Sequence, residues 1–169
     1  MRLQITGIFT AMLITACIAL VISLTRGSNY IANVSWPRVI LFIFLIVPIH
    51  EFLHAVSFKG GITSKRVVFG FYPKMFAFYA CYIGKVAWYR YITISTMPFL
   101  TLTVIPLIIV ILFHLEYTCI VEVIIANGMA SAGDVLTIIT ISKQVPRQSI
   151  LINSGMKTYW KPAAKKFPK

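Results

Sequence analysis

Residues 39–58, with the sequence VILFIFLIVPIHEFLHAVSF, decide how this chain folds. The first eleven of them carry no polar side chain, and the whole stretch is long enough to cross a bilayer as one helix. Near its end stand His50, Glu51 and His54. Because ionisable groups are costly in lipid, we expect these three side chains to face protein and to serve a function there.

Three other stretches are equally poor in charge, at residues 5–25, 92–113 and 118–142. Together the four predict an α-helical integral membrane protein with about four transmembrane helices. The chain has 169 residues, of which 59% are hydrophobic, and its mean hydropathy is +0.85. These values exclude a water-soluble globular domain and leave no room for a large soluble catalytic domain.

The connection between the second and third spans, residues 60–91, is unlike the others. It is rich in valine and aromatic residues, and glycine and proline interrupt it too often for a helix. We therefore expect a short β-rich segment of two or more strands. Because unpaired strand edges are unstable against lipid, this segment should lie at the cytoplasmic interface or against the helices.

Basic residues are concentrated in that connection and in the tail, residues 143–169. The chain has sixteen lysines and arginines against four acidic residues, a formal charge of +12. By the positive-inside rule, both termini and the middle connection are cytoplasmic. We expect a multi-pass domain, residues 1–142, in the cell membrane. The basic loop and tail should contact anionic lipids rather than nucleic acid.

The pattern His50-Glu51-x-x-His54 is the most informative motif of the sequence. On a helix the two histidines lie one turn apart, so both imidazoles can reach one metal ion while Glu51 activates a water molecule. In a chain of this composition the pattern arises by chance about once in a thousand. Two other interpretations stay open: interfacial polar groups that bind nothing, and a metal site without hydrolysis.

A catalytic zinc ion normally has three protein ligands, and depth in the membrane selects the third. At 1.5 Å per residue, His50 and His54 lie about 18 and 24 Å along the second span, and Asp134 lies about 24 Å along the fourth. Glu122 lies only about 6 Å along the fourth span. We therefore expect His50, His54 and Asp134 to hold one zinc ion per chain.

Two features near Asp134 agree with such a site. Small residues at position 128 and at 130–133 let another helix approach closely, although packing alone also explains them. Asn127 lies two turns before Asp134 on the same helix face and could bind substrate or an oxyanion. An interhelical hydrogen bond is an equally good interpretation of Asn127.

Together these features resemble the site-2 protease class of intramembrane zinc metalloproteases. More narrowly, the chain resembles a small bacterial family of zincin peptidases. In that family an HExxH helix precedes a short stranded segment, a proline-containing helix, an Asn…Ser-x-Gly-Asp helix and a basic tail. The pattern falls on the HExxH of residues 50–54, the helix of Pro98, Asn127 and residues 131–134.

Two departures favour the narrower family. Site-2 proteases usually carry a glycine where this chain has Leu53. They also usually have an Asp-Gly pair preceded by a proline, where this chain has Gly133-Asp134-Val135.

The resemblance implies an endopeptidase that hydrolyses membrane protein or peptide substrates, with Glu51 taking up the proton of a zinc-activated water. A substrate helix must unwind before attack. An edge strand within residues 67–72 or 75–83 could hold it extended by β-augmentation. The alternative is a non-enzymatic membrane protein whose metal site serves structure or transport, and Glu51 distinguishes the two.

Overall fold

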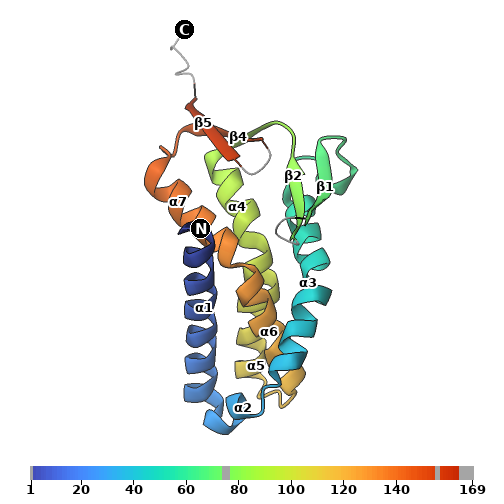
Figure 1. Cartoon of the computed structure of the whole chain (residues 1–169), viewed down its shortest axis with the longest axis vertical. Helices are drawn as coiled ribbons and strands as arrows, with labels where there is room; N and C mark the ends of the chain where they lie inside the picture. Colours follow the sequence, from blue (N-terminus) through green and yellow to red (C-terminus); the bar gives the residue numbers. More distant parts are fainter. Residues whose placement is uncertain (1, 74–76, 155–156, 164–169) are drawn as a thin grey trace.

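The computed structural model describes residues 2–73, 77–154 and 157–163. Its long helices run alongside one another, and the strands gather at one end of the bundle (Figure 1). The helices are α1 (Arg2–Arg26), α2 (Ser28–Ala32), α3 (Trp36–Ser57), α4 (Trp88–Phe99), α5 (Ile105–Leu112), α6 (Thr118–Ala130) and α7 (Ala132–Gln144). The strands are β1 (Val67–Tyr72), β2 (Ala77–Tyr82), β3 (Lys85–Ala87), β4 (Ser149–Ser154) and β5 (Lys157–Pro162).

Three helical stretches are long and apolar enough to cross a membrane: Ile5–Arg26, Trp36–Ser57 and Trp88–Leu112. Helices α6 and α7 make a fourth when taken together. Large apolar side chains cover the outer faces of α1 and α3, among them Phe9 and Phe44, which are 65% and 66% exposed. These helices confirm the predicted class, a mostly helical chain with three to four apolar helices of membrane-spanning length.

The fourth stretch differs from the prediction of one straight span over residues 118–142. The chain bends by 43° between α6 and α7, at Ser131. Serine and glycine are weaker helix formers than alanine or leucine, so Ser131 and Gly133 make this position the easiest place to interrupt the helix. Because of the bend, α7 begins two residues before Asp134.

The third stretch also begins earlier than predicted, at Trp88 rather than at residue 92. Its α4 and α5 are joined by a π-helical turn, Leu100–Val104, which lies between Pro98 and Pro106. Helices of this type occur mostly as single turns at functional sites. The π-helical turn contacts α6, which carries Asn127.

Helix α6 lies at the centre of the bundle. Its Ile124 and Ile125 are at most 1% exposed and belong to one apolar cluster with Ile22 of α1 and Val39 of α3. Gly128 is one of the small residues predicted to allow close helix packing, and α1 approaches it closely. The core therefore fixes α6 against α3, the helix that carries the HExxH motif.

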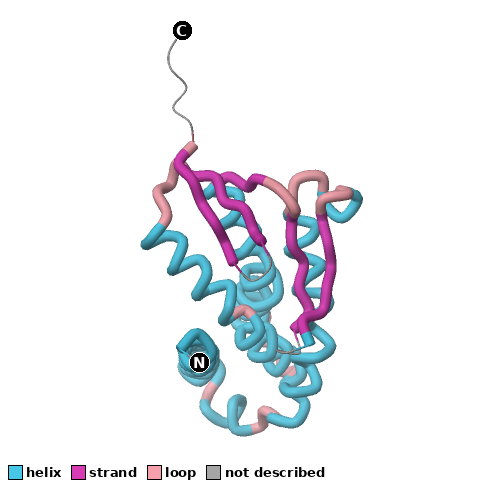
Figure 2. Tube along the Cα trace, turned by 45° about the horizontal axis from the view of Figure 1, so that its top comes forward, coloured by secondary structure: helices cyan, strands magenta, loops and turns pink. Residues whose placement is uncertain are grey.

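The predicted β-rich segment contains β1, β2 and β3. Strands β1 and β2 form an antiparallel hairpin whose register runs from Val67 opposite Tyr82 to Tyr72 opposite Ala77. Strand β3 pairs with β4 of the tail, and β4 pairs with β5. Figure 2 shows the two sheets as neighbouring groups of strands at the same end of the helices. Residues 75 and 76 of the strand predicted over 75–83 lie outside the described residues.

The two strands of the tail were not predicted from the sequence. They hold the tail to the helical domain, because Leu151 of β4 is fully buried against Trp88 of α4 and Ile141 of α7. Residues 155–156 and 164–169 of the basic tail lie outside the described residues.

Polar contacts fix the helices at the end opposite the strands. Glu122 of α6, which is fully buried, accepts hydrogen bonds from the Ser35 backbone N–H at 2.7 Å and from Arg38 Nη2 at 2.9 Å. Tyr30 donates to the carbonyl oxygen of Leu115 at 2.6 Å. The contacts of Glu122 set the position of α6 along α3, because a shift of either helix would leave the Glu122 carboxylate buried and unpaired.

The close approach of α1 to α6 predicts the effect of a substitution at Gly128. A Cβ atom there would lie 2.8 Å from Ile18 Cδ1 and 3.1 Å from Ile14 Cγ2. Gly128→Val should destabilise the fold by about 1–3 kcal/mol through overpacking. Gly7→Val is the matched control, because nothing lies within 4 Å of its Cβ position. Thermal unfolding in detergent measures both, and equal melting temperatures would contradict the packing.

Candidate metal centre

The two histidines of the HExxH motif lie side by side on α3. His50 and His54 are four residues apart, their ring centroids are 5.0 Å apart, and the residues are 4% and 7% exposed. The spacing places both rings on the face of α3 that packs against α4 and α6. Two imidazoles are thus removed from water inside an apolar bundle, where each ring nitrogen requires a partner.

The backbone of α4 supplies the partner for one nitrogen of His54. Its Nδ1–H donates to the carbonyl oxygen of Ile94 at 2.9 Å. In a regular helix this carbonyl would accept the N–H of residue 98, but Pro98 has none. The proline therefore frees the acceptor that orients His54.

The amide of Asn127 supplies the partner for the corresponding nitrogen of His50. Nδ1–H of His50 donates to Asn127 Oδ1 at 3.0 Å, while Asn127 Nδ2 donates to the Pro98 carbonyl at 3.1 Å and to Thr103 Oγ1 at 2.9 Å. Asn127 is fully buried. The structure therefore shows the interhelical hydrogen bond of Asn127, while substrate or oxyanion binding by this residue stays a prediction.

The remaining nitrogens of the two rings converge on one carboxylate oxygen. Asp134 Oδ2 lies 2.9 Å from His50 Nε2 and 3.2 Å from His54 Nε2. Because both Nδ1 atoms donate their protons elsewhere, each neutral ring presents a lone pair at Nε2. Lone pairs that face a carboxylate are favourable only when a cation, either a proton or a metal ion, lies among them.

The donor set fits a zinc ion. Zinc bound tetrahedrally to nitrogen and oxygen at about 2.0–2.1 Å separates its ligand atoms by about 3.3 Å, close to the distances between Asp134 and the two rings. Metal-binding histidines also typically donate the other ring N–H to a carbonyl or carboxylate, as the Nδ1 atoms of His50 and His54 do. Ligand-type atoms of His50, Glu51 and His54 further lie within 4.8 Å of one another.

The backbone of strand β2 holds Glu51 beside this group. Glu51 Oε2 accepts the Ala80 backbone N–H at 2.6 Å. Backbone N–H groups alternate in direction along a strand, and the Ile83 N–H donates to the carbonyl oxygen of Arg66 across the hairpin. Ala80 lies three residues before Ile83, so its N–H points the opposite way, away from β1. The outward edge of β2 therefore faces the HExxH helix. With its carboxylate held by a strand, Glu51 is available for a role other than that of a third ligand.

The other acidic and histidine candidates lie elsewhere. Glu122 is bound to Arg38, which precedes His50 by twelve residues on α3, or about 18 Å. His114 contacts Arg26 at the same end of the bundle. The structure thus brings together His50, Glu51, His54, Asn127 and Asp134 and separates them from Glu122 and His114.

Three groups at the site were missed in the sequence. The carbonyl of Ile94 and the N–H of Ala80 belong to the backbone, so their residue types give no signal. Pro98 gave a partial signal for the Ile94 carbonyl, because a proline within a helix always frees one carbonyl. Thr103, 1% exposed within the π-helical turn, had no signal that separates it from other threonines of that span.

Fold and site together define a class of protein: a mostly helical chain with apolar helices long enough to span a membrane and an HExxH group that could bind a metal ion. Residues 43–150 match the model of the family described as "Putative zincin peptidase". Since this match covers more than half of the chain, the protein belongs to that family. Zincins are zinc-dependent, and the His50, Glu51 and His54 group is one that could bind the metal. Neither a curated protein nor a solved structure matches the chain.

Zinc binding is the first test of this centre. Wild-type protein loaded with zinc in detergent should retain about one ion per chain, and Asp134→Ala should retain none. Asn127→Leu should weaken zinc affinity by about 10- to 100-fold, because the His50 ring loses its orienting partner. Metal analysis and competition with a chelator measure these effects.

The matched control is Glu122→Gln, which removes the charge of another buried carboxylate but keeps an acceptor for Ser35 and Arg38. It should bind zinc like the wild type. Equal zinc content in Asp134→Ala and Glu122→Gln would contradict the assignment of the third ligand.

Proposed function

We propose that the protein is an intramembrane zinc metalloendopeptidase of the site-2 protease type, acting on membrane proteins or peptides. The observation that carries the proposal is the convergence of His50 Nε2, His54 Nε2 and Asp134 Oδ2, with Glu51 beside them. All four side chains belong to helices of membrane-spanning stretches. Family membership supports the coarser statement, a metallopeptidase.

The proposed roles follow from the chemistry of each group. His50, His54 and Asp134 would hold the metal ion. When bound, zinc acts as a Lewis acid that acidifies water and polarises the carbonyl to be cleaved. Glu51 serves as the general base, and then passes the proton to the leaving amine. Asn127 and the Ile94 carbonyl keep the two rings in the orientation that the site needs.

Strand β2 offers a way to bind a substrate in extended form. The alternation of the hairpin directs the backbone of Phe78 and Tyr82, like that of Ala80, away from β1. Because Ala80 N–H reaches Glu51, a peptide pairing with this edge would run past the general base. Such pairing also satisfies the carbonyls that an unwound helix exposes.

The proposed arrangement in the cell membrane keeps both termini and the strands in the cytoplasm. The start of α1, the start of α4 and all five strands lie toward one end of the bundle, while the α1–α3 and α5–α6 connections lie toward the other (Figure 1). The first end also carries most of the basic residues, which favours contact with anionic lipid. The metal centre would then lie near the cytoplasmic surface.

Removal of the general base tests the activity. Glu51→Gln should retain about one zinc ion per chain while cleavage falls by at least about 100-fold, because an amide cannot take up a proton. The assay reconstitutes the protein in liposomes with membrane protein extract from the cells that express it, and identifies new peptide termini by mass spectrometry.

A metal site that serves only structure predicts a different result. Wild type and Glu51→Gln would then give the same termini and the same zinc content. That outcome would contradict the peptidase and favour the non-enzymatic alternative.

A proline on the outward edge of β2 tests the substrate strand. Phe78→Pro removes an N–H that lies outside the β1–β2 ladder, so the hairpin and the zinc content should persist. Cleavage should fall by about tenfold, the equivalent of one lost hydrogen bond. Phe78→Ala is the control for the loss of the ring, which contacts Phe71. Equal cleavage by the two variants would contradict pairing at this edge.

A further inference from the structure

A cavity of about 490 Å³ lies beside the metal centre but outside it. It is enclosed by the end of α3, the β2–β3 connection and the first turns of α4. Phe58, Tyr82, Val86 and Ile94 form its apolar wall, and each is at most 8% exposed. Its volume falls in the range of small-ligand sites.

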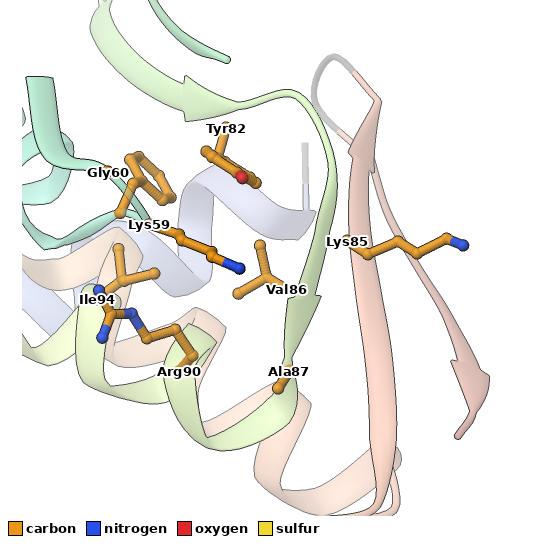
Figure 3. Close-up of a pocket in the computed structure, with 9 residues that line it drawn as sticks. Lys59, Gly60, Tyr82, Lys85, Val86, Ala87, Arg90 and Ile94 are labelled. Carbon is orange, nitrogen blue, oxygen red and sulfur yellow. The ribbon is translucent and has the colours of Figure 1, made fainter. Parts of the chain in front are cut away.

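Two cationic side chains complete the cavity. Figure 3 shows the Lys59 ammonium extending between Tyr82 and Val86, with the Arg90 guanidinium next to Ile94. Arg90 Nη2 donates to the Ser57 carbonyl at 2.8 Å, which fixes the guanidinium while its other N–H groups remain for a ligand. Lys85 also lines the cavity, but its side chain extends away on the other side of β3.

No carboxylate among the described residues neutralises these two charges. None of the lining residues is acidic. Glu51 is held by Ala80, Glu122 by Arg38, and Asp134 faces the histidines. Glu116 lies in the α5–α6 connection, at the opposite end of the bundle. Two cations over an apolar wall, without an internal counterion, are suited to an anion supplied from outside the chain.

The height of the cavity along the bundle indicates which anion. It lies at the level where one membrane-length stretch ends, at Ser57 of α3, and another begins, at Trp88 of α4. Val56, in the last turn of α3, is apolar and 47% exposed, and Tyr89 at the start of α4 is 62% exposed. Apolar surface that ends in aromatic and basic residues is typical of the head-group level, where lipid phosphates are abundant.

We propose that this cavity binds the phosphate of an anionic phospholipid, with Lys59 and Arg90 as its ligands. The acyl chains would remain in the bilayer beside α3 and α4. The inference relies on the membrane placement in the proposed function, but not on zinc or on cleavage. It assigns a lipid site whose wall includes Ile94, the residue whose carbonyl orients His54.

Lipid retention by the full-length protein tests the site. Delipidated protein in detergent is titrated with phosphatidylglycerol or with phosphatidylcholine, and bound lipids are counted by native mass spectrometry. The wild type should retain one phosphatidylglycerol in preference to phosphatidylcholine. Lys59→Gln should weaken that retention by about fivefold. Lys85→Gln, the matched control, removes the same charge from the same rim and should leave retention unchanged.

Three outcomes would overturn the proposal. Equal weakening by Lys59→Gln and Lys85→Gln would show diffuse surface attraction. Failure to retain phosphatidylglycerol, with one inorganic phosphate retained in its place, would show a site for the free ion. Unchanged retention in Lys59→Gln, with altered cleavage of acidic peptides, would show a substrate pocket.

A further variant separates this proposal from the proposed function. Asp134→Ala, which should lack zinc and activity, should retain phosphatidylglycerol like the wild type. If that variant lost phosphatidylglycerol, the proposal that the lipid site is independent of the metal centre would be overturned.

Discussion

Two imidazole rings and one carboxylate meet inside a largely apolar bundle, and this meeting constrains much of the structure around it. Nε2 of His50 and Nε2 of His54 lie 2.9 and 3.2 Å from the same oxygen of Asp134. Three such groups are costly to bury unless each polar atom has a partner. The buried Asn127, the gap in the α4 hydrogen bonds at Ile94 and the bend before α7 all serve that requirement.

Helix irregularities supply the partners that regular helices cannot. Pro98 leaves the Ile94 carbonyl free for His54, and its own carbonyl accepts a hydrogen bond from Asn127 Nδ2. The π-helical turn that follows places Thr103 against the same amide. Pro98 therefore has a chemical role beyond a change in helix direction. It connects an apolar helix to the candidate metal centre without adding a charged residue.

The residues that converge at the site could be predicted from the sequence because helix geometry is periodic. One turn separates His50 from His54, and a rise of 1.5 Å per residue places Asp134 at their depth and Glu122 far from it. The partners of the two histidine Nδ1 atoms and of Glu51 could not all be predicted in this way. Two of them, the Ile94 carbonyl and the Ala80 N–H, are backbone groups. The tail strands were missed as well, because β4 and β5 are stabilised by pairing with β3 and by burial of Leu151, both long-range contacts.

X-ray absorption at the zinc edge of the zinc-loaded protein tests the central claim most directly, because it reports the ligand atoms themselves. A zinc ion held by His50, His54 and Asp134 should show nitrogen and oxygen neighbours at about 2.0–2.1 Å, with the outer-shell scattering of two imidazoles. In His54→Ala, any zinc that still binds should show the scattering of a single imidazole. Sulfur neighbours at about 2.3 Å, or a wild-type spectrum without imidazole scattering, would contradict a centre built on His50, His54 and Asp134.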